Sequence, residues 1–414
     1  DAPVANAARR WNGSDDEEHY LTMRIALLLD AYKPIINGIT TFVSLHKRAL
    51  EEAGHEPWII TLGHTDYQDD EFRVVRSKAV PLSNTGYHIN FGYNREIREL
   101  LRTMDILHVH HPFLSGAMAT TLGPRYGVPV LFTSHTRYDL YAQQYLPILP
   151  ATMSDTFLET FFPAFAQRCS LVIAPSAGIQ EVLRRWGVQG RIEVVPNGIE
   201  LEHFRAPDWH TTRSALGLSE TGAVAVFVGR MSGEKNIQTL LRAFAPVTSE
   251  CPDAHLLMIG GGPELDDFRK LTQEMGIASQ VLFTGPIPYE HMPGYLALAD
   301  FFVTASVSEV HPMTVLEAMA SGLPVLGIDS PGISDTVVNG QNGFVVQHDY
   351  AALALKMLRL FSEPELRASL AAGARQTSTL YDIHTTTQRY VEIYEEQVRQ
   401  RRPARRRWWT QGRR

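Results

Sequence analysis

The chain has 414 residues, 44% of them hydrophobic and 20% charged, which is ordinary for a globular protein and excludes a disordered or fibrous one. This length favours two domains over a single hydrophobic core. The two cysteines, Cys169 and Cys251, form neither a disulfide framework nor a zinc knuckle, so we expect a protein of the reducing cytoplasm. No apolar run reaches the roughly 18 residues needed to span a bilayer.

The formal net charge is −7, but charge is distributed unevenly: the end of the chain is basic and the rest is acidic. Residues 399–414 contain eight arginines and no acidic residue, together with Trp408 and Trp409. Arginines suit anionic lipid headgroups and indoles suit a membrane interface, although a basic tail alone could also meet nucleic acid. The paired tryptophans favour a membrane. Residues 1–22 lack periodicity and a signal-peptide core, and we expect them to be a disordered extension.

From Arg24 onwards, apolar strand-like segments alternate with helix-like ones. The strands are expected over 24–30, 56–62, 105–111, 129–135, 170–176 and from residue 192, with helices over 38–54, up to Tyr126 and over 177–187. Strands that are apolar on both faces and alternate with helices predict a parallel, doubly wound sheet.

The stretch 196–219 interrupts this rhythm and is expected to connect two domains. A second series follows, with strands over 223–230, 254–260, 280–285, 300–306, 324–328 and 342–346, and helices over 236–250, 262–276, 290–299 and 313–320. We expect two α/β Rossmann-like domains that face each other across a cleft. Their bounds are 23–205 and 206–380, followed by a crossover helix over 381–400 and a tail over 401–414.

Two loops in the second half have residues suited to an anion. Arg230 and Lys235 follow the first strand of this half, where a forked guanidinium and an ammonium could hold a pyrophosphate. Gly261 lies in a run of three glycines that would let the backbone approach a ligand. A solvated loop would explain the Arg230 and Lys235 segment equally well, and for the glycine run alone a plain tight turn is the favoured interpretation.

The segment 308–320 combines a helix start with two glutamates. Pro312 opens the helix and leaves its first amides free to face an anion, those of Met313, Thr314 and Val315. Because side chains lean toward the start of a helix, Glu317 could reach a ribose attached to that anion. Glu309 would lie beside a sugar on the other side of the phosphates. Alternatively, Glu309 caps the helix and Glu317 lies on a polar edge.

In the first half, Gly38 lies in a loop between strand and helix. His110, His111 and His135 lie at the ends of two strands, which predicts a polar site. The spacing of histidine and cysteine residues does not support zinc, and there is no Asp-x-Asp pair for a metal-bound diphosphate.

Together these segments resemble the retaining glycosyltransferases of family 4, which have the GT-B fold. The most specific part of the likeness is Glu309 and Glu317 within "SVSEVHPMTVLEAMASGLPV". The segments "FVGRMSGEKN", "IGGGPE", "VVPNGIELEHF" and "VIAPS" follow the family order, and the likeness runs from about residue 23 to residue 400.

The resemblance implies a role for each matching position. Arg230 and Lys235 would hold the donor diphosphate, Glu317 the ribose and Glu309 the donor sugar. The remaining donor-side positions are Met313 and Thr314 at the phosphate turn, Gly261 in the glycine run, His135 near the transferred sugar and Gly38 in the loop that closes over it. The donor would be a nucleotide sugar, with UDP-glucose the best family guess, and no metal or other cofactor would be needed.

The segments "HVHHPFLSG" and "SHTRYDLYAQQY" look like the subgroup that glycosylates diacylglycerol or another lipid headgroup. This implies a lipid acceptor, an acceptor side that includes His110, His111, Tyr138 and Tyr141, and a peripheral place at the inner face of the cell membrane. A glycan, polyprenyl-linked or small soluble acceptor is the alternative. A nucleotide-sugar 2-epimerase would lack the spacing of the two glutamates.

Two positions depart from the family pattern. The first loop has Asn37–Gly38 where a pair of glycines is usual, and the turn after Glu309 has His311–Pro312–Met313 where Phe-Gly-Leu is frequent. Pro312 removes one amide donor from the turn.

Overall fold

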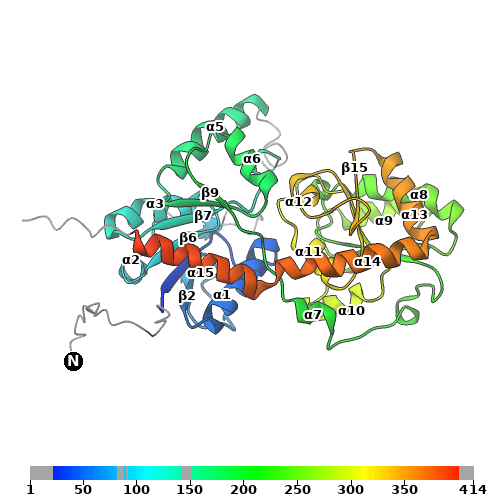
Figure 1. The fold of residues 1–414 in the computed structure, drawn as a ribbon, viewed down its shortest axis with the longest axis horizontal. Helices are drawn as coiled ribbons and strands as arrows, with labels where there is room; N and C mark the ends of the chain where they lie inside the picture. The colour runs from blue at the N-terminus through cyan, green and yellow to red at the C-terminus, as the bar shows by residue number, and fades with distance from the viewer. Residues whose placement is uncertain (1–21, 82–87, 90–91, 141–150, 401–414) are drawn as a thin grey trace, which may run out of the picture.

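The computed structural model describes residues 22–81, 88–89, 92–140 and 151–400. The expectations for residues 1–21, Tyr141 and the tail 401–414 therefore lie outside the described residues. Two α/β lobes lie side by side, and the last long helix extends back over the first of them (Figure 1). This is the expected GT-B arrangement.

The first domain is built on a seven-stranded parallel sheet in the order β3-β2-β1-β6-β7-β8-β9. Its strands are β1 (Arg24–Leu28), β2 (Glu56–Leu62), β3 (Val74–Ser77), β6 (Ile106–Val109), β7 (Val130–Thr133), β8 (Leu171–Ala174) and β9 (Ile192–Val194). Its helices are α1 (Gly38–Glu52), α2 (Arg95–Leu101), α3 (Leu114–Tyr126), α5 (Ala151–Ala166) and α6 (Ala177–Arg185). A separate antiparallel pair joins β4 (Val80–Pro81) to β5 (His88–Ile89).

The second domain has a six-stranded parallel sheet in the order β12-β11-β10-β13-β14-β15. Its strands are β10 (Val224–Val228), β11 (His255–Ile259), β12 (Val281–Gly285), β13 (Phe301–Thr304), β14 (Val325–Ile328) and β15 (Gly343–Val346). Its helices are α8 (Ile237–Glu250), α9 (Leu265–Glu274), α10 (Met292–Leu296), α11 (Met313–Ala320), α12 (Pro331–Ser334), α13 (Tyr350–Ser362) and α14 (Pro364–Ser378). Helix α7 (Leu201–Arg205), which the expected bounds place in the first domain, packs against α10 and α11 and so belongs with the second. Helix α15 (Ile383–Arg399) completes the described chain.

The central strands are apolar throughout because both of their faces are covered. In β1, Ile25 and Leu27 belong to one buried cluster and Ala26 and Leu28 to another, since successive side chains point to opposite faces. Adjacent parallel strands place their carboxyl ends at one edge of each sheet, and the chain reverses its winding direction next to β1 and β10. Ligands of such sheets bind at this edge.

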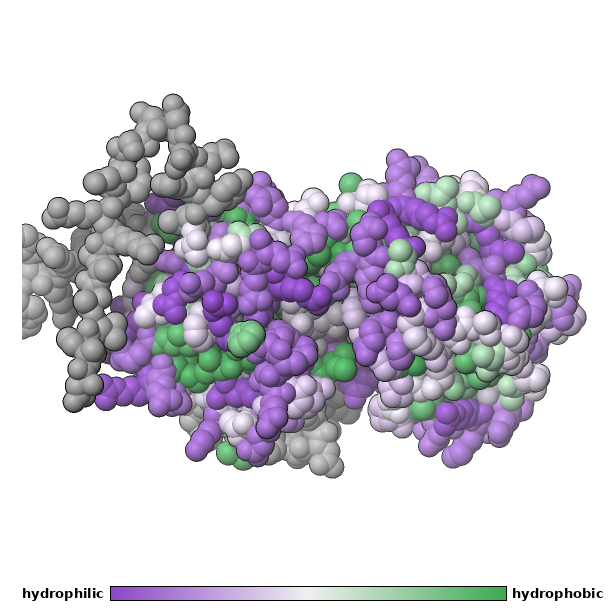
Figure 2. Space-filling view, turned by 90° about the horizontal axis from the view of Figure 1, so that it is seen from below, coloured by the Kyte–Doolittle hydropathy of each residue, from purple (hydrophilic) through white to green (hydrophobic). Residues whose placement is uncertain are grey.

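The surface is mixed in character. Figure 2 shows apolar residues in separate patches on both domains, with polar residues between them. Within the part of the chain that the structure describes, no helix is both long and apolar enough to cross a membrane.

Helix α15 is attached to the first domain by buried hydrogen bonds. The hydroxyl of Tyr394 lies 3.0 Å from Nε2 of His46 in α1 and 2.7 Å from Nδ1 of His108 in β6. The other ring nitrogen of His108, Nε2, is hydrogen-bonded to Thr133 Oγ1 at 2.7 Å. Burial lowers the pKa of His46 to about 3 and that of His108 well below its ordinary value, so both rings are neutral. The tyrosine therefore joins α15 to two elements of the first domain.

We expect Tyr394→Phe to lower the free energy of unfolding by about 1–3 kcal/mol, because two buried imidazole nitrogens lose their partner. Urea unfolding of the full chain measures this change. Tyr350→Phe on the exposed face of α13 serves as the matched control. Equal stability of both variants would contradict the anchoring role of Tyr394.

Candidate active site at the domain boundary

The residues expected to bind a donor follow β10, β11 and β13, and the first-domain residues follow β1, β6 and β7. Hydrogen bonds between neighbouring residues join the two domains directly. The Ser176 hydroxyl, after β8, donates to the Val310 carbonyl at 3.2 Å, and the Gly178 amide donates to Asp335 Oδ2 at 2.7 Å. The carboxyl edges of the two sheets therefore meet at the domain boundary.

Lys235 and Glu309 form an ion pair, with Nζ 2.7 Å from Oε1. Lys235 ends a short 3₁₀ turn (Gly233–Lys235) after β10, and both side chains are largely buried. Arg230 lies on the same loop, is exposed, and makes no hydrogen bond or ion pair with any residue that the structure describes. The loop thus offers one unpaired cation and one cation that already holds a carboxylate.

Helix α11 begins at Met313, and its N-cap residue Pro312 offers no side-chain cap. The Val315 amide donates to the Pro312 carbonyl at 3.1 Å, so the expectation that it is free to face an anion is wrong. The 3₁₀-type closure of the first turn takes up this amide. Met313 and Thr314 remain as the first-turn amides, with Met313 buried and Thr314 half-buried.

The alternative structural roles of the two glutamates are not found. Glu309 pairs with Lys235 and does not cap α11. Glu317 is only 4% exposed, so it does not lie on a polar edge. Burial raises the pKa of Glu317 to about 8, and the nearby Tyr289 hydroxyl offsets part of this rise. Among the residues that the structure describes, Glu317 has no cationic partner, and a buried acid of this kind is suited to hydrogen-bonding with a ligand hydroxyl.

Gly38 lies opposite the start of α11. A methyl group built on Gly38 would lie 3.9 Å from Met313 Cγ, an ordinary contact distance, so the first-domain loop covers the turn of the second domain. Asn37 occupies the position where the family pattern has the first glycine of the pair, and here it caps helix α1. Its Oδ1 accepts from the amides of Ile39 and Thr40 at 3.0 Å, and the Thr40 hydroxyl accepts from the Asn37 amide at 2.9 Å, which is a capping box.

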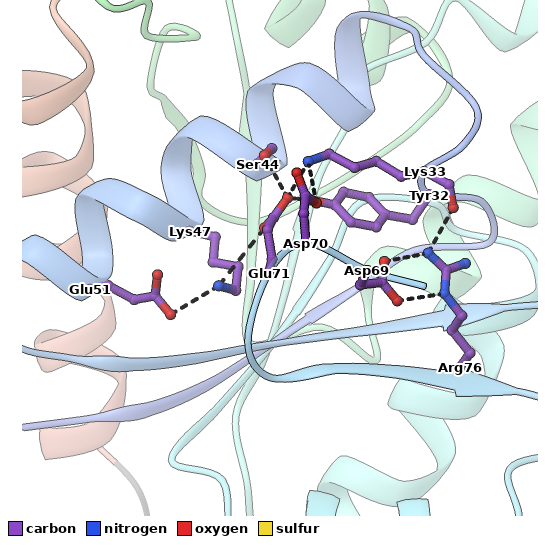
Figure 3. A network of polar contacts seen from close by, with 9 residues as sticks. All are labelled: Tyr32, Lys33, Ser44, Lys47, Glu51, Asp69, Asp70, Glu71 and Arg76. Carbon is purple, nitrogen blue, oxygen red and sulfur yellow. Dashed lines mark hydrogen bonds and ion pairs between the residues drawn. The ribbon is translucent and has the colours of Figure 1, made fainter. Parts of the chain in front are cut away.

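The loop before Gly38 is held from below by a polar network (Figure 3). Glu71 accepts hydrogen bonds from Tyr32, Lys33 and Ser44. Arg76 donates to the Lys33 carbonyl at 2.7 Å and also binds Asp69. The network therefore ties Tyr32 and Lys33, and helix α1 through Ser44, to the segment 69–76.

Gly261 lies where two loops of the second domain touch. The Met231 amide donates to the Gly261 carbonyl at 2.9 Å, and the Glu264 amide donates to the Met231 carbonyl at 3.1 Å. A methyl group on Gly262 would lie 2.3 Å from the Met231 carbonyl oxygen. The glycine run is thus required for the close approach of the loop that carries Arg230.

The two first-domain histidines His110 and His135 lie in contact. His110 Nδ1 is 3.0 Å from His135 Nε2, and the rings stack with centroids 5.2 Å apart. Burial lowers the pKa of His135 to about 3 and that of His110 well below its ordinary value, so neither is protonated at neutral pH. His135 is half-buried beside the domain boundary and is the member of the pair that a ligand could reach.

The other expected acceptor-side residues are more deeply placed. His111 is buried and its Nδ1 accepts from the Asp30 amide at 3.2 Å, which joins β6 to the end of β1. Tyr138 is buried, and its ring packs against Phe113 and Phe162.

Several residues that shape the site were not identified from the sequence. Asp30 holds the start of α3 through the amides of Leu114 and Ser115. An acid that ends the apolar strand "RIALLLD" is a signal that could have identified it. The sequence around Glu71 contains no comparable signal.

Glu317 makes the stability of the protein depend on pH. Its folded pKa of about 8 lies above the ordinary 4.5. Between these values the folded state keeps a proton that the unfolded state has lost, so stability falls as pH rises, by at most about 1.4 kcal/mol per pH unit. We expect Glu317→Gln to flatten this fall, as measured by urea unfolding between about pH 5 and about pH 8. Exposed Glu274→Gln is the control. A wild-type slope in Glu317→Gln would contradict the raised pKa.

Comparison with known proteins agrees with this geometry. The family model for glycosyl transferases group 1 matches residues 210–377, and the model for glycosyltransferase family 4 matches residues 36–203. An alpha-monoglucosyldiacylglycerol synthase of Streptococcus pneumoniae is 30% identical over 348 residues, which are 81% of this chain and 78% of that protein.

Solved structures share the fold. Sucrose-phosphate synthase of Thermosynechococcus elongatus superposes with a TM-score of 0.74 at 23% identity, covering 90% of this chain and 98% of that one. HepE of Anabaena in complex with UDP-glucose gives a TM-score of 0.72 at 18% identity, covering 90% and 100%. The chain therefore belongs to glycosyltransferase family 4 and is a hexosyltransferase with the GT-B fold.

Proposed function

We propose that the chain transfers glucose from UDP-glucose to a diacylglycerol-type lipid with retention of the anomeric configuration. The observation that carries the donor part is the arrangement around the start of α11: Arg230 exposed on its loop, Lys235 beside Glu309, and Glu317 buried within the helix. Cations and first-turn amides match a diphosphate, and the buried carboxyl group of Glu317 matches the ribose attached to it.

The acceptor part rests on likeness. The Streptococcus relative is named for synthesis of a glucosyldiacylglycerol. The tail of arginines and paired tryptophans is chemically suited to an anionic lipid surface. We accordingly place the enzyme at the inner face of the cell membrane, and we do not expect it to bind nucleic acid.

The proposed reaction needs no enzyme nucleophile. The acceptor hydroxyl oxygen bonds to the anomeric carbon while the bond from that carbon to the diphosphate oxygen breaks on the same face. The leaving diphosphate takes the hydroxyl proton. Arg230 and Lys235 stabilise the charge that develops on it, which is the largest contribution such cations make. His135, neutral because burial lowers its pKa to about 3, would hydrogen-bond to the sugar and would not transfer protons.

We expect Lys235→Ala to lower the turnover of sugar transfer by about a hundred- to a thousandfold, the typical cost of removing one donor to a developing anion. Circular dichroism should show an unchanged fold. The control is Lys270→Ala, whose ammonium is exposed and lies 3.9 Å from Asp267 Oδ1. Near-normal turnover in Lys235→Ala would overturn the donor assignment.

A direct assay tests donor, acceptor and stereochemistry together. The purified full chain is supplied with a panel of nucleotide sugars and with vesicles that contain diacylglycerol, and nucleotide release is measured. We expect release with UDP-glucose, an α-glycosidic product by NMR, and unchanged activity with EDTA. Release only with soluble or polyprenyl-linked acceptors would refute the lipid part, and loss of activity with EDTA would refute the metal-independent mechanism.

A further inference from the structure

The two chain segments that connect the domains run side by side. The Ile199 amide donates to the Tyr381 carbonyl at 2.8 Å, and the Ile383 amide donates to the Ile199 carbonyl at 2.9 Å. A methyl group built on Gly198 would lie 2.1 Å from Thr386 Oγ1 and 2.7 Å from Ile383 Cα. The connections around residues 197–199 and 381–383 thus form one closely packed hinge.

The turn that leads into α11 is held from three directions. The Glu309 carbonyl accepts from the Gly332 amide of α12 at 3.2 Å. The Val310 carbonyl accepts from the first-domain Ser176 hydroxyl at 3.2 Å, and the His311 carbonyl accepts from the Asn197 side-chain amide at 2.9 Å. The carbonyls of three successive residues are therefore hydrogen-bonded to the second domain, to the first domain and to the hinge, in that order.

The His311 side chain contacts both connecting segments of the hinge. Its Nδ1 accepts from the Asn197 backbone amide at 3.3 Å, and its ring lies edge-on to the Tyr381 ring with centroids 5.2 Å apart. A backbone amide can only donate, so Nδ1 has no proton and the ring is neutral. Burial supports this state, because it lowers the pKa of His311 to about 4.

We infer that His311 is a positioning residue that keeps the donor-phosphate turn in register with the interdomain hinge. The inference rests on the proposed function, since it assigns the amides of Met313 and Thr314 to the donor phosphates. Only Pro312, with its restricted backbone, separates His311 from these amides. A change at the hinge is therefore passed to the phosphate turn without a flexible residue between them.

Two substitutions separate the ring from its acceptor nitrogen. His311→Phe keeps an aromatic ring against Tyr381 but leaves the buried Asn197 amide without an acceptor. His311→Asn loses the ring but places a side-chain oxygen close to the position of Nδ1. The control is His291→Phe, because His291 stacks on Trp209 with centroids 4.3 Å apart, in a different part of the second domain.

The measurements are the Kd of UDP by titration calorimetry, and KM for the donor and kcat in the transfer assay. We expect His311→Phe to weaken UDP binding and raise KM by about tenfold, with a smaller change in kcat, because an unsatisfied buried amide destabilises the positioned turn. His311→Asn should stay within about threefold of the wild type, as should His291→Phe.

The outcomes separate the inference from the function on which it rests. Equal Kd and KM for His311→Phe and His311→Asn, whether both normal or both impaired, would overturn the positioning role of Nδ1. Should His311→Phe not fold, an impaired but folded His311→Asn would overturn it as well. If the wild type neither binds UDP nor uses any nucleotide sugar, the proposed function itself fails.

Discussion

The candidate site depends on the ion pair between Lys235 and Glu309, and this pair depends on the register of two neighbouring strands. In the second sheet β10 pairs with β13, with Ala225 opposite Phe301, so their carboxyl ends meet at one edge. Each strand is followed by a loop that brings one member of the ion pair over this edge. Because Glu309 is held by Lys235, its carboxylate stays away from the start of α11, where it would compete with an anion.

A second constraint acts on the first domain. The buried hydroxyl of Tyr394 fixes α15 to His46 and His108. The His110–His135 pair follows the carboxyl ends of β6 and β7, and the rings of His108 and His110 are only 4.2 Å apart. The neutral imidazoles form a continuous polar interior from the crossover helix to the domain boundary. His135, which we propose to face the donor, is thereby linked through His110 and His108 to a helix that follows the second domain in sequence.

The sequence was sufficient for the fold class because apolar strands alternated with amphipathic helices, and α11 was predicted with its observed bounds. The sequence did not predict the edge strand β3 or helix α5. Helix α5 contains Pro163, and an internal proline argues against a helix when only the sequence is read. The strand expected over 105–111 ends at Val109, so His110 and His111 belong to the loop. In the site, local spacing could suggest roles for Glu309 and Lys235 but could not show that they bind each other, because 74 residues separate them. The contact of His46 with Tyr394 spans 348 residues and leaves no local pattern.

The position of α15 has a consequence for how the polypeptide is made. The first domain is discontinuous in sequence, since the helix that closes over His46 is synthesised only after the entire second domain. On the ribosome, the first sheet emerges with its buried imidazoles and the apolar face of α1 still uncovered. Its completion must therefore wait until α15 has been synthesised, and a chain that stops short of residue 383 leaves the amino-terminal half unfinished even though every residue of its sheet is present.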